Sequence, residues 1–109
     1  MNILIAEDNE DSRVMACTLL EKSGHQVMSA INGKKALESI KDNRPDLIIT
    51  DILMPEMDGY ELCRAIKNDP DLEDIPLIFY TATYTSQYDI DLGILMGGSR
   101  FLIKPLEPP

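Results

Sequence analysis

The sequence predicts an α/β fold, a doubly wound five-stranded parallel sheet with helices on both of its faces. Short apolar runs, each long enough for one strand, alternate along the chain with stretches whose apolar residues recur at helical spacing. Polar or acidic residues directly follow several of these runs. Strands that alternate with helices are joined by right-handed crossovers, and these give a parallel sheet that helices cover from both sides.

The first half of the chain contains three predicted strands, over residues 2–6, 26–30 and 46–50. A helix capped by Asn9 or Asp11 follows the first strand and extends to about residue 22, before a glycine. Its apolar side chains share one face: Val14, Met15, Thr18 and Leu19. The next helix covers residues 33–41, and its inward side chains are Ala36, Leu37 and Ile40.

The second half opens with Asp51 and a loop that contains Pro55 and Gly59. A helix follows and carries the apolar residues Tyr60, Leu62, Cys63 and Ile66. After a polar connection over residues 68–76, we expect a fourth strand over 77–80 that ends at Thr81. A weaker helix over about 86–96 and a fifth strand over 100–103 complete the pattern.

Length, net charge and cysteine content limit the classes of protein to which this chain can belong. A chain of 109 residues fits one domain, over 1–109, and its net charge of −9 argues against a nucleic-acid-binding face. Cys17 and Cys63 lack metal-ligand spacing and are predicted to be small buried thiols. The absence of a membrane-length apolar run and of a basic leader predicts a cytoplasmic protein without membrane contact.

The last residues, 106–109, resemble the entry to a helix that the sequence does not continue. A doubly wound sheet needs such a helix to cover its final face. We therefore expect the last helix to be truncated, or its place to be taken by a partner chain or a rearranged terminus.

Five polar residues stand at the carboxyl ends of predicted strands: Glu7 and Asp8, Asp51, Thr81, and Lys104. Functional groups of open α/β sheets gather at this edge, in the crevice where the strand order reverses. Three carboxylates that meet there repel one another unless a cation lies between them, and hard oxygen ligands favour Mg²⁺. The sequence therefore predicts a magnesium site.

Asp51 is the predicted nucleophile of this site. A carboxylate can attack phosphorus to give an acyl phosphate, and phosphoryl transfer requires mainly positioning and neutralisation of the charge on the transferred oxygens. Mg²⁺, the ammonium of Lys104 and the hydroxyl of Thr81 can supply that neutralisation. Each residue taken alone has an ordinary structural role, as a cap, a surface charge or a strand former, and it is their joint placement that favours chemistry.

The segments IAEDN, DILMPEMDG, TA and FLIKP, in this order, closely resemble the receiver domain of two-component response regulators. The resemblance implies a flavodoxin-like strand order of 2-1-3-4-5. It also implies that a histidine kinase or phosphotransfer protein phosphorylates Asp51, and that the chain is not an enzyme beyond catalysing its own phosphorylation and dephosphorylation. Mg²⁺ would be held by Glu7, Asp8, Asp51 and the backbone carbonyl of Leu53, and Thr81 and Lys104 would contact the phosphoryl group.

The resemblance further implies a switch in which Thr81 moves toward the phosphoryl group and the aromatic residue of the fifth strand, here Phe101, reports the change. The Lys104–Pro105 peptide bond would be cis. Arg100 departs from the acidic residue common in the family, which puts a homodimer through this face in doubt. Any output domain would follow the receiver, and a stand-alone protein or a fragment of a longer one is equally compatible with the sequence.

Three other functions are compatible with parts of this sequence. An aspartate-nucleophile phosphatase or dehalogenase normally has a second aspartate where this chain has Leu53, and a flavodoxin-like electron carrier needs a phosphate loop that the acidic segment after the first strand would repel. A degenerate receiver that acts only through protein contacts remains the stronger alternative. It would have lost the acid, threonine or lysine that this chain keeps.

Overall fold

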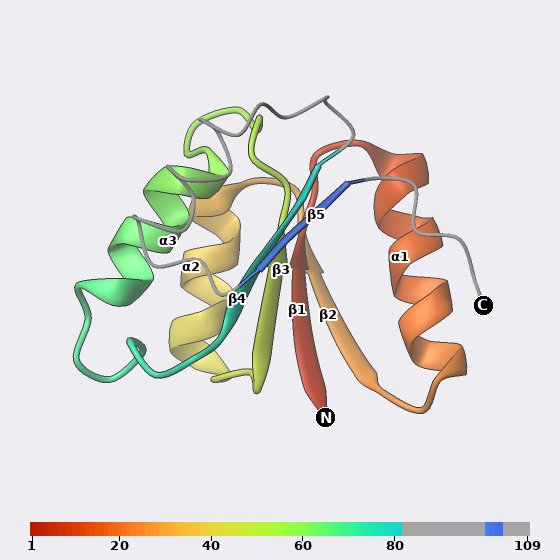
Figure 1. Ribbon diagram of the computed structural model, residues 1–109, viewed down its shortest axis with the longest axis horizontal. Coiled ribbons are helices and arrows are strands. Elements are labelled where there is room, and N and C mark those ends of the chain that lie inside the picture. The colour runs from red at the N-terminus through yellow and green to blue at the C-terminus, as the bar shows by residue number, and fades with distance from the viewer. Residues whose placement is uncertain (82–99, 104–109) are drawn as a thin grey trace.

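The computed structural model describes the backbone of residues 1–81 and 100–103. The strands among these residues form a parallel five-stranded sheet in the order β2-β1-β3-β4-β5 (Figure 1). The fold class and strand order predicted from the sequence are thereby confirmed. The predicted helix over 86–96 and the last helix lie outside the described residues. The strands are β1 (Asn2–Ala6), β2 (Gln26–Ala30), β3 (Leu47–Thr50), β4 (Leu77–Thr81) and β5 (Arg100–Ile103); the helices are α1 (Glu10–Lys22), α2 (Gly33–Asp42) and α3 (Gly59–Lys67).

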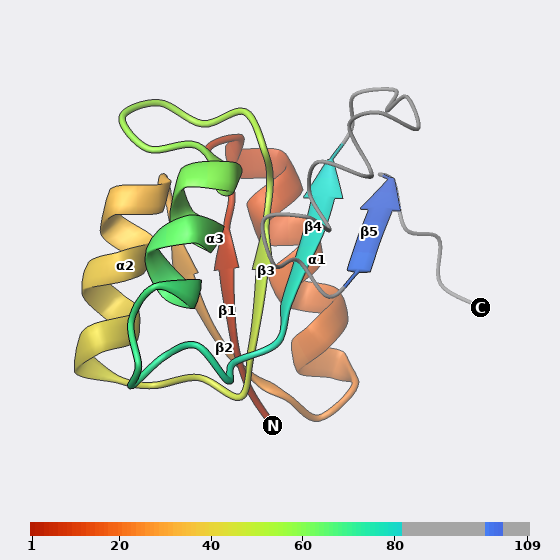
Figure 2. The same cartoon turned by 60° about the vertical axis from the view of Figure 1, so that its left-hand side comes forward.

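The described helices lie on both faces of the sheet, with α1 on one side and α2 and α3 together on the other (Figures 1 and 2). Each begins at a side-chain cap that accepts a backbone N–H: Asn9 from Ser12, Asn32 from Lys35 and Asp58 from Glu61. Such caps satisfy donors that the first turn of a helix leaves without a partner. None of the described helices is long and apolar enough to cross a membrane.

The main hydrophobic core lies between the sheet and the pair α2 and α3. Leu4, Ile48, Leu77 and Phe79 from three adjacent strands are fully buried there. The predicted inward residues of the two helices join them: Ala36, Ile40, Leu62, Cys63 and Ile66 are fully buried, and Leu37 and Tyr60 pack against the cluster. Alternate residues of a strand face opposite sides of the sheet, and this accounts for the half-buried side chains between the core positions of β3 and β4.

Helix α1 differs from the other two because none of its residues is fully buried. The apolar residues predicted to share a face do so, since Val14, Met15, Thr18 and Leu19 line one shallow groove. That face is nevertheless turned outward, and the side chains of Val14 and Met15 are each 56% exposed. Apolar residues also occur on the sheet-facing side of α1, so periodicity locates the helix without identifying its buried side.

The strand register aligns the carboxyl ends of three strands. Ala6 of β1 pairs with Ala30 of β2 and with Thr50 of β3. The backbone of Thr81 in β4 pairs with that of Ile103 in β5. Residues that follow these positions therefore leave the sheet at one edge.

Candidate functional site

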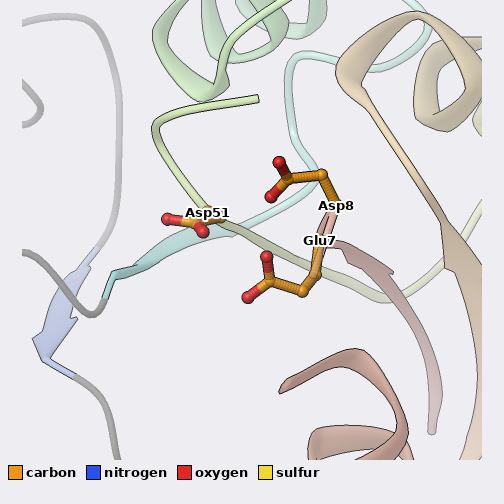
Figure 3. Close-up of side chains that lie close together, drawn as sticks. All are labelled: Glu7, Asp8 and Asp51. Atoms are coloured by element: carbon orange, nitrogen blue, oxygen red, sulfur yellow. The ribbon is translucent and has the colours of Figure 1, made fainter. Parts of the chain in front are cut away.

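Three carboxylate side chains meet at this edge (Figure 3). Glu7 and Asp8 follow β1 and Asp51 follows β3, and each offers one oxygen such that the three oxygens lie within 4.8 Å of one another. Glu7 is buried at 2% exposure, Asp51 is half-buried and Asp8 is exposed. Of the five polar residues predicted to converge at the strand ends, these three carboxylates lie together in the structure.

Backbone hydrogen bonds that continue the sheet hold two of these residues. The Glu7 N–H donates to the carbonyl of Ala30 at 2.9 Å, and the Asp51 N–H donates to the carbonyl of Ala6 at 2.9 Å. Each carboxylate also accepts from a nearby backbone: Asp51 Oδ1 from the Ile52 N–H at 2.7 Å and Glu7 Oε2 from the Asn9 N–H at 3.1 Å. The carboxylates consequently take their positions from the rigid end of the sheet.

The oxygens of this cluster suit a hard divalent cation. Like charges this close repel in a partly desolvated site, and a cation that contacts several of them removes the repulsion. Mg²⁺ binds in proteins through one or two carboxylates while it keeps several waters, and an exposed carboxylate beside a buried one leaves room for such waters. The residues present therefore fit the magnesium ion that the sequence predicts.

The loop after Asp51 runs over residues 52–58, and its first four side chains alternate between buried and exposed. Ile52 and Met54 are buried at 8% and 9% exposure, whereas the Leu53 side chain between them is 66% exposed. Gly59, the first residue of α3, donates its N–H to the carbonyl of Ile52 at 2.7 Å. A Cβ added at Gly59 would overlap the backbone carbonyl of Asp51, so only glycine lets α3 begin this close to the site.

Some predicted site residues fall outside the described part of the chain. The backbone of Thr81 ends β4 at the same edge as the carboxylates, and the backbone of Phe101 lies in β5. Lys104 and Pro105, with their peptide bond, lie outside the described residues. The roles of these residues, and of the Leu53 carbonyl, stay predictions.

Two residues beside the site were not singled out from the sequence. Arg13 of α1 donates from its guanidinium to the carbonyl of Glu7 at 3.0 Å and lies 3.5 Å from that of Asp8. Gly33 of α2 donates its N–H to the carbonyl of Met57 at 3.0 Å. The sequence carries a signal for Arg13, because an arginine stands one turn into the helix that follows the acidic pair. The contact of Gly33 joins segments that lie far apart in the sequence, and it leaves no periodic signal.

A flavodoxin-like sheet with an acidic cluster at its carboxyl edge defines a class of α/β proteins with a carboxylate site at the strand switch point. The family model for the response regulator receiver domain matches residues 3–109. The chain belongs to the receiver domain family of response regulators.

Individual relatives agree with this assignment. Protein PilG of Pseudomonas aeruginosa is 35% identical over 107 residues, which cover 98% of this chain and 78% of PilG. The transcriptional regulatory protein AfsQ1 of Streptomyces coelicolor is 31% identical over 97% of this chain, but the chain spans only 45% of AfsQ1. The crystal structure of the receiver domain of a signal transduction histidine kinase from Syntrophus aciditrophicus is 40% identical with a TM-score of 0.87, over 97% of this chain and 80% of that one.

Proposed function

We propose that residues 1–109 form one receiver domain in which the Asp51 carboxylate accepts a phosphoryl group from a histidine kinase or phosphotransfer protein. Family membership supports the coarser role, a phosphoacceptor of two-component signalling. The observation that carries the finer assignment is the meeting of Glu7, Asp8 and Asp51 within 4.8 Å at the edge of the sheet. Among these three, Asp51 is the half-buried one that follows the central strand β3.

In this reaction a carboxylate oxygen of Asp51 attacks phosphorus, a P–O bond forms, and the bond to the donor's imidazole nitrogen breaks. The other ring nitrogen of the donor's imidazole takes up a proton from water, so that the leaving group is neutral imidazole. The Ile52 N–H, which donates to Asp51 Oδ1 at 2.7 Å, holds one oxygen and so fixes the orientation of the carboxylate. Orientation of this kind is a large part of what a protein contributes to phosphoryl transfer.

Mg²⁺ supplies charge neutralisation at the transferred oxygens when bound. Glu7, Asp8 and Asp51 would hold it, together with the Leu53 carbonyl. Thr81 and Lys104 would contact the phosphoryl group, Thr81 and Phe101 would carry the switch, and the Lys104–Pro105 bond would be cis. We propose in addition that the protein acts in the cytoplasm as a signalling module, without membrane or direct nucleic-acid contact. Its further partners would be an output domain C-terminal to this segment, which receives the signal, and a second copy of the chain in a homodimer.

The test is the intact mass after incubation with Mg²⁺ and acetyl phosphate. We expect one added phosphoryl group on the wild type, none on Asp51→Asn and none in the presence of a chelator. Asp42→Asn is the matched control, because Asp42 is an exposed aspartate at the end of α2 and outside the carboxylate cluster. It should be phosphorylated like the wild type.

If acetyl phosphate gives no adduct, binding of beryllofluoride in the presence of Mg²⁺ decides the matter. Binding that depends on Asp51 would keep the phosphoacceptor proposal and identify acetyl phosphate as a poor donor. No binding would overturn the proposal in favour of a degenerate receiver that acts through protein contacts alone.

A further inference from the structure

The first residue of α2 contacts the loop that follows Asp51. Gly33 donates its N–H to the carbonyl of Met57 at 3.0 Å. A Cβ added at Gly33 would lie 2.5 Å from that carbonyl oxygen and 2.9 Å from Met57 Cγ. Real Cβ atoms do not approach a backbone oxygen so closely, so any side chain at position 33 must displace the loop. We call this hydrogen bond between Gly33 and Met57 the latch.

The latch completes the capping of α2. The first turn of a helix has N–H groups that the helix itself does not satisfy. The side chain of Asn32, buried at 6% exposure, accepts from the Lys35 N–H at 2.8 Å, and the Met57 carbonyl accepts from Gly33. Because Gly33 is buried, loss of the latch would leave its N–H without a partner and away from water. The helix and the loop therefore stabilise each other.

The loop needs this support because its backbone is strained next to the latch. The Met57 N–H donates to the carbonyl of Pro55 at 2.7 Å, which closes a three-residue turn around Glu56. Glu56 has a φ of 66°, in the left-handed region that residues other than glycine rarely adopt. A turn of this form with positive φ is the rare and strained one, and it persists only where the surroundings hold it.

The loop is thus held at both ends, at Met57 by Gly33 and at Ile52 by the Gly59 N–H at 2.7 Å. Asp51 immediately precedes it and Leu53 lies within it. A displacement of Met57 therefore changes the path of the backbone that carries two of the groups assigned to the magnesium site.

We propose that Gly33 is a positioning residue, and that the latch couples helix α2 to cation binding at the carboxylate cluster. This inference rests on the proposed function for the identity of the cation. Coupling between two sites is reciprocal, so an intact latch strengthens Mg²⁺ binding and bound Mg²⁺ strengthens the latch by the same factor. The N-terminus of α2 then senses whether the site is occupied.

The test compares Mg²⁺ affinities of folded variants by isothermal titration calorimetry. Removal of partners that orient metal ligands typically lowers metal affinity 10- to 100-fold, and we expect Gly33→Ala to weaken Mg²⁺ binding about 10-fold. Two control substitutions lie in the same helix: Ile40→Val trims a fully buried side chain far from the loop, and Lys34→Ala changes an exposed neighbour of Gly33. Both should bind Mg²⁺ like the wild type, although Ile40→Val lowers the thermal midpoint.

Hydrogen exchange of the Gly33 amide in the wild type gives a second measurement that does not depend on the folding of Gly33→Ala. Its protection should rise when Mg²⁺ is added and stay unchanged in Asp51→Asn. The coupling is overturned if Gly33→Ala binds Mg²⁺ as tightly as the wild type and if Mg²⁺ does not change the protection of the Gly33 amide. That result leaves the proposed function intact. Equal weakening in Ile40→Val also overturns it, because general destabilisation would then be the cause. A wild type that binds no Mg²⁺ overturns the metal assignment and the coupling together.

Discussion

Replacing Asp8 by asparagine should stabilise the metal-free protein, because it removes one of three mutually repelling charges. Two unit charges 4.8 Å apart repel by about 3.5 kcal/mol at an effective dielectric constant of ~20, and by about 0.9 kcal/mol in water. Asp8 is exposed, so its repulsion from Glu7 and Asp51 lies toward the lower figure. We expect Asp8→Asn to raise the free energy of unfolding by about 1–2 kcal/mol.

The assay is thermal unfolding in a chelating buffer at low ionic strength. For a domain of this size, 1 kcal/mol shifts the midpoint by roughly 4–8 °C, so the gain should be readily measured. Asp42→Asn is again the control, since it removes the same charge at an exposed position outside the cluster. It should move the midpoint much less, and added salt should reduce the effect of Asp8→Asn because salt screens exposed charges.

Addition of Mg²⁺ should reverse the difference in thermal midpoint, so that the wild type unfolds at a higher temperature than Asp8→Asn. At a concentration one hundred times the dissociation constant, a ligand stabilises the folded state by about 2.7 kcal/mol, more than the expected gain of Asp8→Asn in chelator, and the wild type, unlike Asp8→Asn, has all three carboxylates to bind the ion. The reasoning from charge repulsion is refuted if Asp8→Asn leaves the midpoint in chelator unchanged or lowers it, and if the variant then responds to Mg²⁺ like the wild type.

Three other measurements probe the surroundings of the site. Gly59→Ala should lower stability by about 1–3 kcal/mol in denaturant unfolding and weaken Mg²⁺ binding, because the new Cβ overlaps the Asp51 carbonyl; an unchanged midpoint would show that the loop can yield. Burial raises the pKa of the Cys63 thiol, against a lowering by a nearby lysine, and burial and a nearby glutamate raise the pKa of the half-buried Cys17. Because reaction needs an exposed thiolate, alkylation followed by mass should be slow at neutral pH, accelerate as the pH rises, and reach Cys17 before Cys63; Cys63 labelling first would contradict the burial order. Leu53 follows Asp51 by two residues and is apolar, so we expect it to limit the access of hydrolytic water and to give slow loss of phosphate from the phosphorylated protein; a half-time of seconds that Leu53→Asn leaves unchanged would contradict this.

The carboxylate cluster was predictable because it follows from two general properties of parallel sheets. Carboxyl ends of parallel strands share an edge, and the pair Glu7 and Asp8, like Asp51, stands at the end of a strand that an apolar run predicts. The distance among their oxygens was not predictable, because it depends on the aligned pairing of Ala6 with Thr50. A register shift of one residue would have turned one set of side chains away from the other.

The outward face of α1 and the latch were beyond sequence reasoning for different physical reasons. Val14 and Met15 have the spacing of a buried stripe, yet the other side of α1 packs against β1 and β2. Hydrophobic periodicity reports that a face is apolar and leaves open whether anything covers it. The latch depends on a close approach between the backbones of Gly33 and Met57, which side-chain patterns do not encode.

The site combines charge repulsion with rigid support, and this combination explains how a small chemical event can act on the fold. Backbone hydrogen bonds from Glu7 and Asp51 to the neighbouring strands keep the carboxylates close, although each would lower its electrostatic energy by moving away. Because the backbone holds the carboxylates in place, their repulsion persists until a bound cation neutralises it. A cation bound at the cluster lowers this repulsion, whereas a phosphoryl group on Asp51 adds negative charge, so either event changes the forces on the adjoining loop. In the coupling that we propose, Gly33 and Gly59 are the two contacts through which the loop acts on helices α2 and α3.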